Sequence, residues 1–405
     1  MRVQVPRSRI RPDRQQAAVN PLELFFDLVF VFALTQVTAF MADALSWHGL
    51  LRGVLIIALL WWAWTGYAWL ANVASADEPE IKLAILVAMS AMFVLALTIP
   101  EAFHDGPGGL DGPVVLALCY LLVRVCHFGI FMIIAQEDAG LRAQLLRFAP
   151  SVVGSTIVLL VASQFEGWVQ TALWVLALVV DYVGTALGGA AGWRLPAPGH
   201  FSERHGLIII VALGESIVAI GVGVAELPIT LPIVIASGLG LVLASAMWWA
   251  YFDVSALLGE HALANEPTET RPRLGRNAFS FDHFPLMVGI VLVALGLKKV
   301  LEYVGDTEQH ALTDPLKGVA LAALVGGVVV YLLAHVEFKW LTVHTVSTVR
   351  LGTAGAMLLA WALMGKVPAI GQLAVVAALL LACLVVESVV HAEDRRKIRA
   401  ELARH

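Results

Sequence analysis

Long apolar runs separated by short polar breaks constrain this chain more than any other feature. Inside a bilayer, every backbone polar group has to be paired within the protein, so a lipid-crossing stretch of this kind folds as an α-helix. We therefore predict an all-α membrane protein with about twelve transmembrane helices, the fifth of them short. The predicted spans are 22–42, 50–71, 82–103, 114–135, 148–163, 167–189, 206–225, 229–251, 283–303, 318–338, 347–364 and 368–390.

The composition agrees with this fold class and excludes several functions. Hydrophobic residues make up 59% of the 405-residue chain and charged residues 14%, whereas a soluble domain carries about 25% charged residues. Cys119, Cys126 and Cys383 all lie in apolar runs, which argues against a disulfide framework and shows no metal-site spacing. Glycine-rich phosphate loops, nucleophile elbows, HExxH motifs and basic nucleic-acid patches are absent from the sequence. We expect no catalytic residue, no metal, no cofactor and no nucleic-acid partner.

The distribution of lysine and arginine predicts the orientation in the membrane. With a cytoplasmic N-terminus, 20 of the 26 Lys and Arg residues fall in cytoplasmic segments or tails. Cytoplasmic segments of membrane proteins carry such an excess of basic residues. We therefore expect a protein of the bacterial inner membrane with both termini in the cytoplasm, including basic tails at 1–20 and 391–405.

Short motifs recur in the same order in the two halves of the chain. Since each half would hold six spans, an even number, the halves would be parallel repeats. We predict a first six-helix repeat at 21–195 and a second at 196–390; the alternative is chance similarity among helices rich in Leu, Val and Ala. The matched motifs are Ala33-Leu-Thr-Gln36 with Ala212-Leu-Gly-Glu215, Trp61-Trp62-Ala63 with Trp248-Trp249-Ala250, Tyr120-Leu-Leu-Val-Arg124 with Tyr331-Leu-Leu-Ala-His335, and the runs ending in Asp181 and Glu387.

Four motifs carry a resemblance to a known family. They are Glu23-Leu-Phe-Phe-Asp27-Leu-Val-Phe-Val-Phe, Glu203-Arg204-His205-Gly-Leu followed by Ala212-Leu-Gly-Glu215-Ser216-Ile, Tyr251-Phe-Asp253, and His283-Phe-Pro. Over about residues 19–340 the chain resembles the bacterial low-temperature-requirement A (LtrA) family. The resemblance implies a protein integral to the membrane. Because the family is named for a cold-growth phenotype, a role in stress adaptation is one expectation.

Charged residues inside the predicted spans form the candidate site. An ionised Asp near the bilayer centre costs about 2.5–3.5 kcal/mol on insertion scales, so such a residue faces a partner, a cavity or a pathway. Arg124 stays charged and needs a carboxylate or an anion, and Asp181 is the best candidate for its partner. Asp27 is either a cation or proton site or an interfacial carboxylate paired with Arg204. The residues predicted for a transport or ion path are Asp27, Gln36, Arg124, His127, Asp181 and Glu215.

Further polar residues are secondary candidates with plainer alternatives. Capping and a span boundary explain the Glu-Arg-His run, and an isolated histidine is commonly packed or interfacial. Glu215 itself suits ion coordination or a satisfied interhelical hydrogen bond equally well. The secondary candidates are Glu23, Glu203, Arg204, His205, Asp253, His283 and His335.

Three classes of function fit these residues. The leading hypothesis is a transporter or channel-like protein that passes a small solute or ion along a polar path between the repeats. The second is a membrane-embedded enzyme for a lipid or other apolar substrate, with Asp27, Glu215 or His127 as acid or base. The third is a structural, sensory or stress-adaptation protein whose ion pairs only specify packing, which requires every buried charge to be paired. Beyond the lipid bilayer, the sequence names neither the solute nor the oligomeric state.

Overall fold

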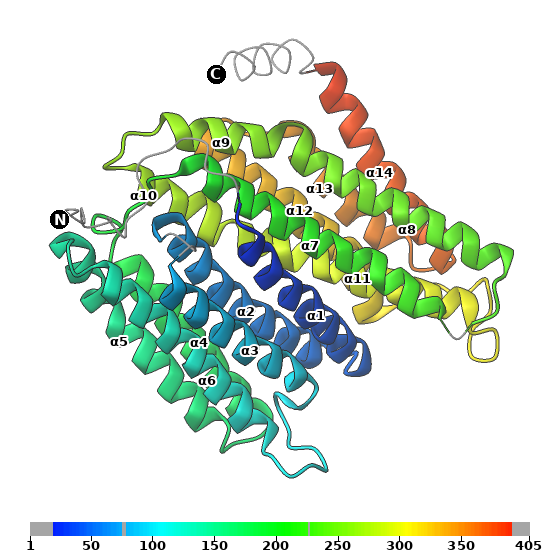
Figure 1. The fold of residues 1–405 in the computed structure, drawn as a ribbon. Helices are drawn as coiled ribbons and strands as arrows, with labels where there is room; N and C mark the ends of the chain where they lie inside the picture. The colour runs from blue at the N-terminus through cyan, green and yellow to red at the C-terminus, as the bar shows by residue number, and fades with distance from the viewer. Residues whose placement is uncertain (1–18, 75–77, 226, 391–405) are drawn as a thin grey trace. The chain divides into compact units, whose positions relative to one another are not determined.

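The computed structural model describes residues 19–74, 78–225 and 227–390, and the predicted basic tails lie outside this part except for residues 19 and 20. Nearly all described residues are helical (Figure 1), so the predicted all-α fold is confirmed. The α-helices are α1 (Pro21–Asp43), α2 (Trp47–Val73), α3 (Pro79–Leu97), α4 (Gly112–Ile134), α5 (Ala139–Ala162), α6 (Gly167–Leu187), α7 (Pro198–Val224), α8 (Leu231–Ala250), α9 (Ala256–Asn265), α10 (Arg271–Leu274), α11 (His283–Gly305), α12 (Gly318–Val343), α13 (Thr348–Leu363) and α14 (Ala369–Val390).

The helix lengths agree with a membrane protein. In the part of the chain that the structure describes, eleven helical stretches are long and apolar enough to cross a bilayer. Each of these overlaps one predicted span. The remaining predicted span, 347–364, forms α13, which has 16 residues. At 1.5 Å per residue it is about 24 Å long, shorter than a typical hydrocarbon core.

Helix α5 corrects the prediction of a short fifth span at 148–163. It begins at Ala139 and has 24 residues, with Asp138 as its N-cap. Its first turns bury an apolar stripe, while Arg142 and Arg147 point outward and are exposed. The two arginines suggested a polar break to sequence analysis, but a helix tolerates them on its outward face.

The chain between α8 and α11 is also largely helical, although the sequence predicted that about 252–282 is the longest segment outside the membrane. It contains α9, α10 and two π-helical segments, η2 (Tyr251–Ser255) and η3 (Gly275–Phe281). A wide turn is visible at Asp282, whose backbone amide donates to the Asn277 carbonyl five residues earlier, at 3.1 Å. Single π-helical turns occur frequently at functional sites.

The helices form two compact units. Among the described residues, unit 1 comprises 19–33, 58–74, 78–204 and 266–276, and unit 2 comprises 34–57, 205–225, 227–265 and 277–390. In unit 1, α3 packs against α4, α4 against α5, and α5 against α6 (Figure 1). In unit 2, α11 packs against α12, and α14 packs against α8, α11 and α13. The two parallel six-helix repeats remain a prediction.

The closest helix contact in unit 2 joins α11 and α12 through glycines. A Cβ atom on Gly327 would lie 2.7 Å from the Gly289 carbonyl oxygen and 2.8 Å from the Val293 backbone nitrogen. A Cβ atom on Gly296 would lie 2.6 Å from the Cα atom of Leu324. Small residues at such positions let two backbones approach closely, which is how helices associate in lipid.

We predict that Gly327→Ala destabilises the protein, because the new methyl group meets backbone atoms that cannot rotate away. The expected cost is about 1–3 kcal/mol, the usual range for overpacking. Thermal unfolding of the detergent-solubilised protein measures it. Gly326→Ala is the matched control, since a Cβ atom there meets nothing within 4 Å. Equal melting temperatures for the two variants would contradict the close packing of α11 on α12.

Candidate functional site

Two acidic and two basic side chains face one another in unit 1. Glu23 and Asp27 are four residues apart on α1, as are His200 and Arg204 on α7, so each pair lies on one helix face. His200 Nε2 lies 2.8 Å from Glu23 Oε2, and the Arg204 guanidinium donates to both Asp27 oxygens at 2.6 and 2.9 Å. Both contacts join residues 177 positions apart, so the first turns of α1 and α7 run in the same direction. We call these four residues the α1–α7 ladder.

The ladder is buried, and an aromatic ring packs against it. The exposed fraction of each of its four residues is 3% or less. Trp64 Nε1 donates to Asp27 Oδ1 at 2.8 Å, and the Arg204 guanidinium lies 5.5 Å from the centroid of the Trp64 ring.

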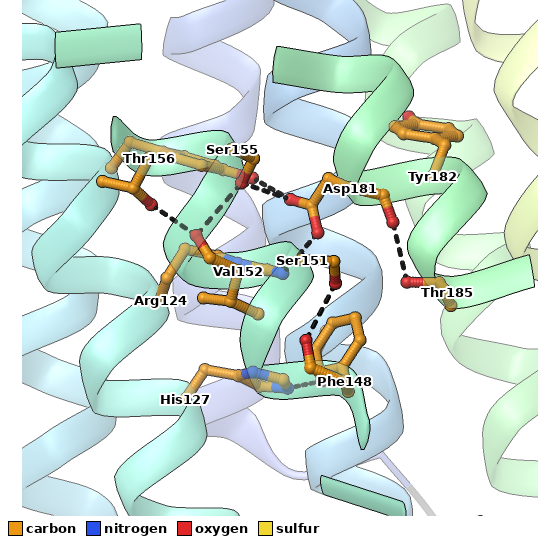
Figure 2. A network of polar contacts seen from close by, with 12 residues as sticks. Arg124, His127, Phe148, Ser151, Val152, Ser155, Thr156, Asp181, Tyr182 and Thr185 are labelled. Carbon is orange, nitrogen blue, oxygen red and sulfur yellow. Dashed lines mark hydrogen bonds and ion pairs between the residues drawn. The ribbon is translucent and has the colours of Figure 1, made fainter. Parts of the chain in front are cut away.

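Arg124 pairs with Asp181, the partner predicted for it (Figure 2). Arg124 Nη2 donates to Asp181 Oδ1 at 2.9 Å, and both side chains are at most 2% exposed. The Tyr120 and Ser155 hydroxyls donate to Asp181 Oδ2 at 2.9 and 3.3 Å. The guanidinium also lies 5.2 Å from the centroid of the Phe148 ring. This pair from α4 and α6 has one charge of each sign, which fits a role in packing.

Helix α5, which supplies Ser155, is held at its N-terminus by Asp138. The Asp138 carboxylate accepts from the Leu141 amide at 2.9 Å and from the Arg194 guanidinium at 2.9 and 3.1 Å. Burial raises the pKa of Asp138, but these donors lower it more, so the pKa lies below its ordinary value. The cap therefore stabilises the fold above pH ~4, the ordinary Asp pKa, and this contribution is lost as the pH falls through the lower folded-state pKa.

Aromatic residues connect the arginine pair to the ladder within unit 1. The Tyr67 hydroxyl donates to the Val123 carbonyl at 3.0 Å, next to Arg124 in the chain. The Tyr67 ring lies 4.9 Å from the ring of Phe26, which precedes the second carboxylate of the ladder. His127 Nε2 lies 3.0 Å from a backbone carbonyl of α2, so this nitrogen carries the proton. His127 is thereby a hydrogen-bond donor to α2.

Glu215 meets a hydroxyl group instead of a cation. It lies on α7 in unit 2 and is 1% exposed. The Thr35 hydroxyl donates to Glu215 Oε2 at 2.6 Å, and Thr38 lies beside the same carboxylate. Lys298 of α11 attracts Glu215 from a greater distance. Among the described residues, no Lys, Arg or His forms an ion pair with it.

Three candidate histidines gather around Tyr251 in unit 2. His283 Nε2 lies 2.8 Å from the Tyr251 hydroxyl, and His283 Nδ1 lies 2.9 Å from the Ala278 carbonyl. The His205 ring is 5.2 Å from the His283 ring, and the His335 ring is 5.9 Å from the Tyr251 ring. Because a carbonyl only accepts, His283 Nδ1 donates and Nε2 is left to accept from Tyr251 in the neutral ring. Within the described chain, no group of three or more His, Cys, Asp or Glu side chains could hold a metal ion.

A second arginine–carboxylate pair lines a cavity in unit 2. Arg350 donates to the two Glu387 oxygens at 2.9 and 3.1 Å, to the Ser255 hydroxyl at 3.1 Å and to the Ala250 carbonyl at 2.9 Å. Together with Asp253, the pair lines a cavity of about 450 Å³. This arrangement joins η2, α13 and α14.

Comparison with known proteins decides the family. The model of the bacterial low temperature requirement A protein (LtrA) matches residues 18–385, nearly the whole chain. The chain belongs to the LtrA family. It is also similar to an uncharacterized protein of Rhizobium meliloti (strain 1021), with 30% identity over 289 residues, 68% of this chain and 67% of that protein. No solved structure matches the chain.

The contacts bring the LtrA motifs together in pairs. The first motif supplies Glu23 and Asp27, the second supplies Arg204, and the two meet in the α1–α7 ladder. The third supplies Tyr251 and the fourth His283, which share a hydrogen bond. The residues that carry the family resemblance are therefore in contact with one another.

Two predicted residues stand apart from these clusters. Gln36 is half-buried and makes no hydrogen bond within the described part of the chain; its neighbour Thr35 contacts Glu215 instead. Glu203 is exposed and forms no ion pair with the residues that the structure describes. Its position therefore fits the alternative interpretation, in which Glu203 lies at the boundary of a span.

Sequence analysis missed several residues of these clusters, among them His200, Trp64 and Thr35. His200 precedes Arg204 by one helical turn, and the two carboxylates of α1 have the same spacing, so this signal could have revealed it. Nothing in the sequence distinguishes Trp64 from the tryptophans around it. Thr35 is one of many hydroxyl residues in the spans, and a hydroxyl has no charge that demands a specific partner.

We predict that Arg204→Gln destabilises the protein by about 3–5 kcal/mol, because Asp27 is then a buried charge without its counter-ion. The double variant Arg204→Gln/Asp27→Asn should regain much of this loss, since no charge is left uncompensated. Melting temperatures of the wild type, both single variants and the double variant measure the coupling.

The control is Arg194→Gln, which breaks a pair whose arginine side chain is 40% exposed. Pairs open to water contribute about 1 kcal/mol or less. The ladder would not be the buried pair described here if Arg204→Gln melted at the same temperature as Arg194→Gln.

Proposed function

We propose that this LtrA protein moves a small solute or ion across the membrane, and that Glu215 takes up and releases a proton or a monovalent cation. One observation carries the proposal: within a span, a carboxylate that is 1% exposed has no ion-pair partner among the described residues. Carboxylates inside membranes are costly and mark ion pathways and proton relays.

Other carboxylates give the contrast. Buried Asp27 and Asp181 and half-buried Glu387 each contact an arginine. Buried Asp282, just before α11, resembles Glu215 in having no ion pair among the described residues. If the charges of this protein served only to specify packing, Glu215 would have such a partner too. An unpaired carboxylate has a reason to bind a cation from solution, and the third hypothesis, packing alone, does not supply that reason.

The chemistry around Glu215 favours a hard cation or a proton. The carboxylate and the Thr35 hydroxyl are oxygen groups, which suit protons and alkali ions better than soft transition metals. The Ser216 hydroxyl is buried and has no hydrogen-bond partner among the described residues, so a further oxygen is available nearby. Lys298 attracts the same carboxylate without pairing with it. A bound cation and Lys298 would therefore compete for Glu215.

We also propose an orientation for this transport. The excess of Lys and Arg in alternate segments supports a bacterial inner membrane with both termini in the cytoplasm. In that orientation the α1–α7 ladder lies near the cytoplasmic ends of its helices and would form the cytoplasmic entrance. The proposal treats the protein as a transporter, not an enzyme, and its partners as lipid and a small solute or ion.

The test is flux through purified protein in liposomes loaded with a pH-sensitive dye, under imposed proton, Na⁺ or K⁺ gradients. The wild type should pass at least one of these ions faster than empty liposomes. In Glu215→Gln the flux should fall to the empty-liposome rate, because the amide keeps the Thr35 contact but does not ionise.

Glu302→Gln is the matched control in the same unit, because this carboxylate is 35% exposed and pairs only with its neighbour Lys299. Its flux should equal that of the wild type. Transport that persists unchanged in Glu215→Gln, or a wild type that passes none of the three ions, would refute the assignment.

A further inference from the structure

The carboxylate of Asp282, just before α11, is buried without a hydrogen-bond partner. Asp282 is 3% exposed, and neither of its carboxylate oxygens accepts a hydrogen bond within the described part of the chain. None of the ion pairs there includes it. It lies in the helical stretch Arg271–Gly305, which is long and apolar enough to cross a bilayer. We infer that Asp282 is a proton-binding site whose proton is in place at neutral pH.

The electrostatics of this position favour a bound proton. An ionised carboxylate without a partner is so unfavourable in an apolar medium that the group takes up a proton instead. Glu337 of α12 adds to this cost, because its negative charge repels an ionised Asp282. A proton on Asp282 removes both the buried charge and the repulsion. The neutral acid is therefore the form that the folded chain stabilises.

The polar rings near Asp282 do not supply this proton. The charge of Asp282 acts on Tyr251, but the Tyr251 hydroxyl donates to His283 Nε2 at 2.8 Å. His283 Nδ1 in turn donates to a backbone carbonyl of η3 at 2.9 Å. His335, whose ring is 5.9 Å from the Tyr251 ring, donates from Nδ1 to a backbone carbonyl of α12 at 2.9 Å. Because each of these donors is engaged elsewhere, the proton on Asp282 has to come from solvent.

An exposed carboxylate provides the link to solvent. Glu337 is exposed, and it is near enough to Asp282 for the two charges to interact. A negative charge at the surface raises the local concentration of cations, protons included. Glu337 therefore collects protons close to the buried acid.

Asp282 is separate from the carboxylate of the proposed transport site, and this inference does not depend on that proposal. Lys298, which attracts Glu215, lies about 24 Å further along α11 than Asp282, at a rise of 1.5 Å per residue. Asp282 also has its own backbone feature, a wide turn in which its amide donates to the Asn277 carbonyl. Turns of this kind occur frequently at functional sites.

The direct test is infrared spectroscopy of the detergent-solubilised full chain at neutral pH. The wild type should show the carbonyl band of a protonated carboxylic acid, shifted in heavy water, and Asp282→Asn should lose it. Glu302→Gln is the control and should keep the band, because this carboxylate is 35% exposed and pairs with a lysine. Glu215→Gln should keep it too, so the two proposals fail separately. A band that Asp282→Asn leaves unchanged, or no band at all, would overturn the inference.

Glu337→Gln tests the site with Asp282 in place. The variant removes the repelling charge at an exposed position. An ionised Asp282 then costs less, so the band should disappear at a lower pH than in the wild type. The same titration in both proteins, or a shift to higher pH, would contradict the role of Glu337.

Thermal unfolding as a function of pH gives an independent readout. Above pH ~4, the ordinary Asp pKa, the unfolded chain releases the Asp282 proton while the folded chain keeps it, so the wild type loses stability as the pH rises. Asp282→Asn has no such proton, so its melting temperature relative to the wild type should increase between pH ~4 and neutral pH. A relative melting temperature that stays constant or decreases over this range would show an ionised Asp282 and overturn the inference.

Discussion

The cost of removing charge from water determines much of this structure. A buried ion without a partner is strongly destabilising, and in lipid the apolar faces of helices gain little by meeting one another instead of acyl chains. Charged pairs therefore specify which helices are neighbours: the ladder joins α1 to α7, the Arg124–Asp181 pair joins α4 to α6, and the Arg350–Glu387 pair joins α13 to α14. Close glycine contacts between α11 and α12 then add packing to these electrostatic constraints.

In the proposed function, stability and ion binding fall to different carboxylates. An arginine that donates two hydrogen bonds holds its carboxylate in one geometry and leaves it poorly available to other cations. Asp27 and Glu387 are held in this way. A threonine hydroxyl stabilises Glu215 without neutralising it. A protein that must both stay folded in lipid and exchange an ion benefits from this division, because release of the ion does not break a structural pair.

Sequence analysis predicted the spans and the Arg124–Asp181 pair, and it gave Arg204 as the partner of Asp27 in one of two alternatives. In lipid the backbone polar groups must pair within the protein, so each apolar run folds as a helix. Arg124 is permanently charged, and few carboxylates lie at a similar depth in the membrane, so Asp181 could be predicted as its partner. The start of α5 was missed because two exposed arginines resemble a polar break. The Glu215–Thr35 contact and the π-helical segments were missed because neither a hydroxyl partner nor a wider helical turn changes the composition of the chain.

The equal four-residue spacing on α1 and α7 means that the two contacts of the ladder fix the register of the two helices. Sliding α7 along α1 by one turn, about 5.4 Å, would bring Arg204 level with Glu23 and carry His200 past the start of α1. Asp27 would then remain buried without its arginine. A shift of less than one turn would leave neither carboxylate level with a basic side chain. The cost of an uncompensated buried charge, about 3–5 kcal/mol, therefore opposes every register except the observed one. The ladder sets the axial position of one helix relative to the other, to within a single turn, without any covalent link between them.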